Sequence, residues 1–98
     1  MKSVIIHDAA LCEIESAATW YESKSEDLGL SFFVEIERSV EMVGRHPEAW
    51  PNFIEGTRQF VLKRFPYSLV YRDVGAYLEV VAVRHHRQQK DYWTERLC

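Results

Sequence analysis

The sequence predicts an α+β fold with the element order β-αα-βββ, in which an N-terminal helical hairpin packs on an antiparallel sheet. Two observations support this prediction. In the first half of the chain, apolar residues recur at helical spacing in two segments, which a short polar break at residues 23–25 separates. From residue 58 onward the apolar period changes to two, and turn residues divide the chain into three strand-like segments.

The size and composition of the chain predict one small domain. Of its 98 residues 47% are hydrophobic, so it can bury one modest core, and we expect a single domain over residues 1–98. No apolar run reaches the ~18 residues of a membrane span, and the first residues lack the pattern of a signal peptide. We therefore expect a cytoplasmic protein without a membrane segment.

The first half of the chain contains a short strand and the two helices. Three β-branched residues predict a strand over residues 2–7, after which Asp8 is expected to cap a helix that runs to about residue 23. A second helix is expected from about residue 26 to Gly44, because Gly44 and Pro47 form a helix stop signal.

Helical spacing also predicts which side chains face the core. The inner faces of the two helices are expected to carry Leu11, Ile14, Ala17, Ala18, Tyr21, Phe33, Ile36, Val40 and Val43. The charged residues between them, including Glu13 and Glu35, are expected to face water.

The second half of the chain predicts a loop, three strands and a tail. Trp50 and Phe53 are expected to hold the loop 47–56 against the body of the protein. The first strand is expected to begin at residue 58, the second to span 67–72 and the third 77–84. A turn is expected at 73–76 and a partly helical tail at 88–97. The apolar run in the last strand predicts a central position with at least one covered face. The sheet face opposite the helices is expected to be partly open and lined by basic residues.

Charge is distributed unevenly along the chain. Up to Gly56 there are four basic and eleven acidic residues, a net charge of −7, whereas from Thr57 there are eight basic and four acidic residues, a net charge of +4. This asymmetry predicts one face that attracts anions. The alternative is that helices with solvated glutamates and strands with arginines carry the imbalance without a function.

The sequence contains no cofactor motif. Its two cysteines, Cys12 and Cys98, form no metal-binding spacing, and we expect no functional disulfide in a cytosolic protein. A glycine-rich phosphate loop, a paired-aspartate site and a nucleophile elbow are all missing. We therefore expect no metal and no cofactor.

The densest cluster of chemically active side chains follows the last strand. His85 and His86 lie between Arg84 and Arg87, where positive charge favours the neutral imidazole. A neutral imidazole is able to accept the proton of a ribose 2′-hydroxyl, and a guanidinium is able to stabilise the phosphorane that forms. Adjacent strand residues point to opposite faces, however, so the alternative is that one histidine is structural and the other exposed.

Arginines and aromatic residues in the same half could form a binding surface. A phosphate or an acidic peptide would suit the arginines, and the residues expected on a binding surface for a partner are Arg58, Arg64, Arg84, His85, Trp93 and Arg96. The alternative for the arginines is a solvated face with structural ion pairs, such as Arg96 with an acid on a helix. Tyr92 and Trp93 either stack on a base or anchor the tail.

These motifs resemble the RelE/ParE family of type II toxin–antitoxin toxins. The resemblance rests on Leu28-Gly29 before Phe32-Phe33, on Arg58, on Phe65-Pro66-Tyr67 with Val70-Tyr71, on Ala82-Val83, and on His85 or His86 with Arg87, Tyr92-Trp93 and Arg96. The basic positions of RelE-like nucleases fall near Gln59 and Val61, on Ser68 and near His86, so only the tyrosine is kept, as Tyr92. The chain is therefore more similar to ParE-like members.

The resemblance implies a function for the chain and partners for it. A ParE-like toxin, of the plasmid-stabilisation type, inhibits DNA gyrase, causes growth arrest and is neutralised by a cognate antitoxin, with which it forms a hetero-oligomer. The alternative is a RelE-like endoribonuclease that cuts mRNA on the ribosome, with His86, Arg87 and Tyr92 as catalytic residues. A third reading is a non-toxic binding module of the same fold, and a homodimer is left open.

Overall fold

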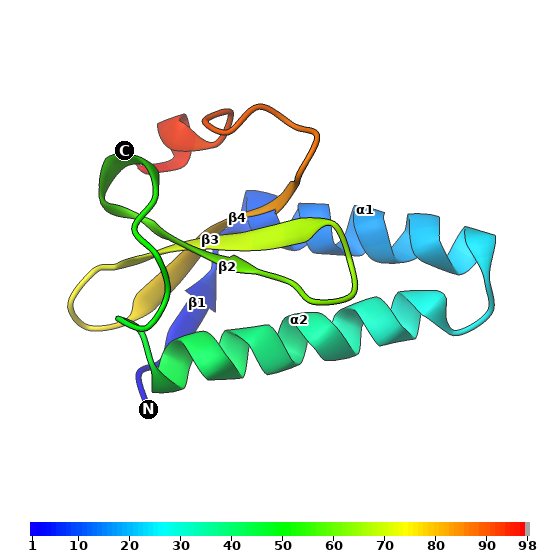
Figure 1. Cartoon of the computed structure of the whole chain (residues 1–98), viewed down its shortest axis with the longest axis horizontal. Coiled ribbons are helices and arrows are strands. Elements are labelled where there is room, and N and C mark those ends of the chain that lie inside the picture. The colour runs from blue at the N-terminus through cyan, green and yellow to red at the C-terminus, as the bar shows by residue number, and fades with distance from the viewer. Residues whose placement is uncertain (98) are drawn as a thin grey trace.

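The computed structural model describes residues 1–97 and combines two long helices with a four-stranded sheet (Figure 1). The elements are β1 (Val4–Ile6), α1 (Asp8–Lys24), α2 (Leu28–Arg45), β2 (Arg58–Val61), β3 (Tyr67–Asp73) and β4 (Leu78–His85), with short 3₁₀ helices η1 (Ile54–Gly56) and η2 (Thr94–Leu97). This order confirms the predicted β-αα-βββ arrangement and the helical turn in the tail. None of the helices in the described residues combines the length and the apolar composition needed to cross a membrane.

The sheet has the strand order β1-β4-β3-β2. The last three strands form the predicted antiparallel meander, whereas β1 pairs with β4 in parallel, with Val4 opposite Leu78. The parallel pair differs from an all-antiparallel sheet. It is possible because the helical hairpin forms the long crossover connection that a parallel strand needs. As predicted, β4 is central.

A histidine, not the expected aspartate, caps α1. His7 Nδ1 accepts a hydrogen bond of 3.0 Å from the backbone N–H of Ala9, and Asp8 is already the first helical residue. The sequence-based assignment of Asp8 as the cap was therefore wrong by one residue. In the first turn, the carboxylate of Asp8 still interacts favourably with the positive end of the helix dipole.

The two helices approach closely where the hairpin turns. Glu22 accepts backbone N–H groups from Asp27 and Gly29, at 3.0 and 2.9 Å. A Cβ atom on Gly29 would lie 2.6 Å from the carbonyl oxygen of Ala18, so only glycine allows this approach without rearrangement. The link itself uses a left-handed conformation at Asp27, with φ of 67°.

The main core lies between the hairpin and one face of the sheet. Its aromatic centre is formed by Tyr21, Phe32, Phe65 and Tyr67, whose rings contact one another at centroid distances between 4.8 and 6.3 Å. Two residues assigned to the inner faces are instead exposed, Leu11 at 43% and Phe33 at 42%. Helical spacing gives the direction of a face but not its width, and Phe32, next to Phe33, is the one that is buried.

The opposite face of the sheet is covered as well. Val70, Val81 and Ala82 pack against Trp93 from the C-terminal segment, and Phe53 from the loop stacks on Trp93 at 6.1 Å. Figure 1 shows this segment, coloured red, across the strands from α2. The expectation of a partly open basic face is therefore wrong for this part of the sheet, whereas the expected anchoring of the loop is confirmed.

The structure describes one of the two cysteines, Cys12. Cys12 is exposed and free. Cys98, for which we expected no disulfide, lies outside the described residues.

Candidate binding surfaces

The two histidines at the end of β4 belong to opposite faces of the sheet. His85 packs edge-on against Tyr67 at 4.9 Å on the helix side. His86 Nε2 is hydrogen-bonded to the Ser68 hydroxyl at 2.9 Å, and its backbone N–H donates to the carbonyl of Pro66. His85 is the last residue of β4 and His86 the first residue after it, and the side-chain alternation of the strand carries over to separate the two imidazoles.

The environment of His86 favours its neutral form. Partial burial, followed by the positive charge of Arg84, lowers the pKa of this imidazole below its ordinary value of 6.5. A neutral imidazole close to a hydroxyl has the chemistry of a proton acceptor. Ser68, however, is fully buried on an inner strand, whereas His86 is exposed, so the Ser68 hydroxyl occupies Nε2 of an otherwise accessible imidazole.

Tyr92 and Arg96 are held by a carboxylate on α1. The Tyr92 hydroxyl donates to Glu13 at 2.6 Å, and the Arg96 guanidinium contacts both oxygens of Glu13 at 3.1 Å. Glu13 also accepts the backbone N–H of Val83, so the prediction that it faces water is wrong. Burial and the bond to Glu13 raise the pKa of the Tyr92 hydroxyl.

The three candidate catalytic residues therefore have separate partners. Tyr92 is bonded to α1 and His86 to β3, and no hydrogen bond within residues 1–97 joins them. Arg87 is exposed, and its backbone N–H donates to His85 Nδ1. A nuclease would need these groups to converge on one phosphate.

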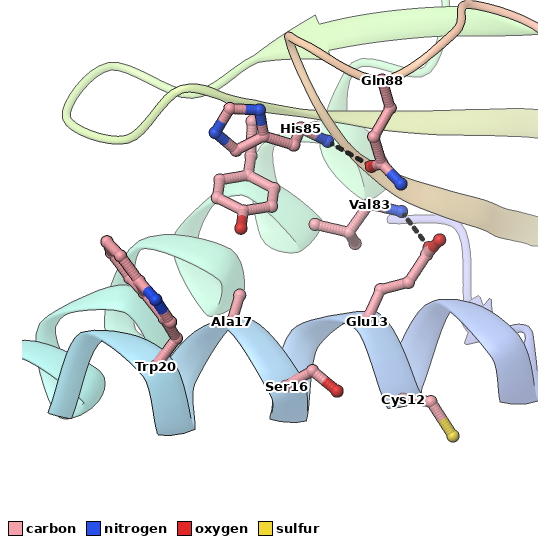
Figure 2. A pocket seen from close by; sticks show the side chains of 9 residues that line it. Cys12, Glu13, Ser16, Ala17, Trp20, Val83, His85 and Gln88 are labelled. Atoms are coloured by element: carbon pink, nitrogen blue, oxygen red, sulfur yellow. Dashed lines mark hydrogen bonds between the residues drawn. The ribbon is translucent and has the colours of Figure 1, made fainter. Parts of the chain in front are cut away.

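An open groove lies between α1 and the end of β4 (Figure 2). Its volume is about 420 Å³. Figure 2 shows Glu13 and Trp20 of α1 on one side and His85 with Gln88 on the other, while Cys12 and Ser16 project away from the strands. Trp20 is 57% exposed, which gives this groove an aromatic wall.

Several of the arginines expected on the binding surface have internal partners. Arg58 donates to the carbonyl of Trp50 at 2.6 Å, and Arg96 is paired with Glu13 as described above. Arg84 and Trp93 are almost fully buried. Arg64 remains exposed, with its guanidinium 5.6 Å from the ring of Phe65.

A second groove runs between α2 and the edge strand β2, with a volume of about 480 Å³. The side chains that line it are Glu35, Arg38, Ser39, Met42, Trp50, Pro51, Gln59, Phe60, Val61, Lys63 and Arg64. Its bed is apolar, and three basic residues form its rim. Sequence reasoning did not identify Gln59, Val61 or Met42 as binding residues, because they lie on different elements and only the fold brings them together. The one sequence signal for a binding surface here was Val61, an apolar residue that alternates with Phe60 and Leu62 and so falls on the side of the strand shared by Gln59 and Lys63.

We name this groove the α2–β2 groove. Glu35 is one of the residues that line it. Its carboxylate accepts the backbone N–H groups of Lys63 and Arg64 at 2.7 and 3.0 Å. Glu35 is buried, so its predicted position on the solvent face of the helix is wrong. Its bonds fix the β2–β3 connection against α2.

These features define a small α+β protein whose accessible surface offers binding grooves and no assembled catalytic group within the described residues. A model of the ParE toxins of type II toxin–antitoxin (parDE) systems matches residues 4–90. The chain belongs to this family, which confirms the resemblance to RelE/ParE toxins and to their ParE-like members.

Solved structures agree with this assignment at the level of the fold. The chain is similar to one described as the chromosomal ParDE TA system from P. aeruginosa, with a TM-score of 0.64 and 18% sequence identity. The similarity covers 87% of this chain and 96% of the other. The comparison with curated proteins finds no match.

Proposed function

We propose that this ParE-family toxin arrests growth by binding DNA gyrase and that a cognate antitoxin neutralises it. The observation that carries the proposal is the family match over residues 4–90. It is supported by the separation of His86 and Tyr92, each of which has a structural partner. A toxin that acts by binding needs no converging catalytic groups.

The α2–β2 groove is the surface that suits an antitoxin. Its apolar bed fits the apolar side of an amphipathic segment, and its rim of Arg38, Lys63 and Arg64 fits acidic residues. A segment that orders on binding is able to cover such a groove and the adjacent sheet edge. The groove thus provides both the apolar area and the charge that a specific partner requires.

The gyrase proposal is tested by adding the purified chain to DNA gyrase and measuring supercoiling of relaxed plasmid. We expect inhibition that depends on the dose of toxin and that persists in a His86→Ala variant with an intact fold. In cells, pulse-labelling after induction should show that DNA synthesis falls before protein synthesis.

The ribonuclease alternative predicts the opposite pattern. Protein synthesis would fall first, mRNA would be cut in codon phase, and His86→Ala would abolish the effect. Failure to inhibit gyrase in vitro, together with these cuts, would overturn the proposal. If neither DNA synthesis nor protein synthesis fell, the chain would be a non-toxic binding module.

A further inference from the structure

Arg84 is a buried cation without a carboxylate partner. The residue is 6% exposed. In the described residues its Nη atoms donate only to uncharged oxygens. These are Gln59 Oε1 and the Gln88 carbonyl, both at 3.2 Å, and the His85 carbonyl at 3.4 Å. Its Nε–H has no acceptor. Within residues 1–97 no acidic side chain forms an ion pair with it. Burial of a guanidinium is costly unless an anion balances its charge.

The groups around Arg84 compensate this charge only in part. The ring of Phe53 lies 5.8 Å from the guanidinium and offers a cation–π contact. The positive charge of Arg84 is, after burial, one of the causes that lower the pKa of His86. The site therefore has an electrostatic preference for an anion that residues 1–97 do not supply.

Gln59 connects this cation to the α2–β2 groove. It lies on β2, lines the groove together with Val61, and its amide oxygen is the side-chain acceptor for Arg84. A carboxylate has nearly the same shape as this amide group and carries the missing charge. Because β2 is an edge strand, an extended acidic segment is able to lie beside it and reach the same position.

We propose that Arg84 binds a carboxylate of an acidic protein segment seated in the α2–β2 groove. That carboxylate displaces the Gln59 amide as the hydrogen-bond acceptor of Arg84. The identity of the segment as an antitoxin rests on the proposed function, whereas the carboxylate site does not. A carboxylate is favoured over a phosphate because the space of one amide group is small and the bed of the groove is apolar.

The site is tested first with acetate, in the absence of any partner. The Nε–H resonance of Arg84 in ¹⁵N-arginine-labelled protein is followed during titration with sodium acetate against sodium chloride at constant ionic strength. We expect a saturable shift for Arg84 and none for Arg64, the matched exposed arginine. Equal shifts of both, or no shift of Arg84, would overturn the proposal, and a stronger response to inorganic phosphate would assign the site to phosphate instead.

Gln59→Glu tests the same site from within the chain. The new carboxylate should pair with Arg84, raise the unfolding midpoint and abolish the response of Arg84 to acetate. A lower midpoint would show that the site rejects a carboxylate. Neither this test nor the acetate titration depends on gyrase or on an antitoxin, so both are able to succeed where the proposed function fails.

The partner side is tested with Arg84→Met, which keeps an unbranched apolar stem and removes the charged guanidinium. The variant should fold with unchanged or higher stability, because a buried unpaired charge is lost. Its affinity for the cognate antitoxin should fall by about 30-fold or more, whereas Arg64→Met should change affinity much less. Equal affinities of wild type and Arg84→Met would refute the carboxylate contact.

Discussion

Two ionisable side chains near the end of β4 are held in one protonation state by their surroundings. Partial burial and Arg84 lower the pKa of His86, whereas burial and Glu13 raise the pKa of Tyr92. In both cases the neutral form is favoured. The residues that look most reactive in the sequence are therefore fitted to structural hydrogen bonds in the fold.

The lowered pKa of His86 makes stability depend on pH. Between the lowered value and the ordinary 6.5, the unfolded chain binds more protons at this residue than the folded chain. The stabilising contribution of neutral His86 to the free energy of unfolding is therefore complete above pH 6.5 and is lost as the pH falls through this window. We expect the free energy of unfolding of the wild type, minus that of His86→Gln, to decrease on acidification below about 6.5. Urea unfolding at a series of pH values measures this difference, and a difference independent of pH would contradict the assignment.

At the scale of elements, one buried carboxylate holds the β2–β3 connection against α2. Replacing Glu35 by alanine leaves the backbone N–H groups of Lys63 and Arg64 without their acceptor. We expect a loss of about 1–3 kcal/mol in the free energy of unfolding, measured by urea denaturation. The matched control is Glu37→Ala, an exposed position on the same helix, which should change stability by less than about 0.5 kcal/mol. Equal effects of the two substitutions would argue against the bonds.

The elements themselves were predictable from the sequence, because apolar periodicity and turn residues act locally. The roles of Glu13 and Glu35 were not. Helical spacing places both on a polar face, but their hydrogen-bond partners lie 70 and 28 residues away in the chain, at Val83 and Lys63. The cap by His7 was missed because aspartate is the more common capping residue. Only the tertiary fold decides which polar side chains meet backbone groups.

At the scale of the whole molecule, the sheet is covered on both faces, and several of the basic side chains expected on its surface are held by internal partners. Arg72 pairs with Glu79, Arg96 with Glu13, and Arg84 is buried. The excess of basic residues after Thr57 was visible in the sequence. Which of these bases stay accessible was not, since that depends on the path of the C-terminal segment over the sheet. The α2–β2 groove, assembled from two distant segments, lay equally beyond sequence reasoning.

The C-terminal segment is a part of the core and not a detachable tail, and two tryptophans test this. Trp93 is fully buried against Val81 and Ala82, whereas Trp20 is exposed on α1. Replacing Trp93 by alanine should cost about 3–5 kcal/mol, a large share of the roughly 5–15 kcal/mol that stabilises a domain. Replacing Trp20, whose contacts are with Tyr21 and Lys24 at the surface, should cost no more than about 1 kcal/mol.

Urea unfolding of both variants, followed by circular dichroism, separates these effects. If the Trp93 variant were as stable as the wild type, the segment would be free to leave the sheet, and its face would be available to a ligand. A large loss confined to Trp93 would instead mean that any protein partner must bind the grooves that remain outside this cover. The accessible surface of the toxin is in that case set by how its own C-terminal segment packs.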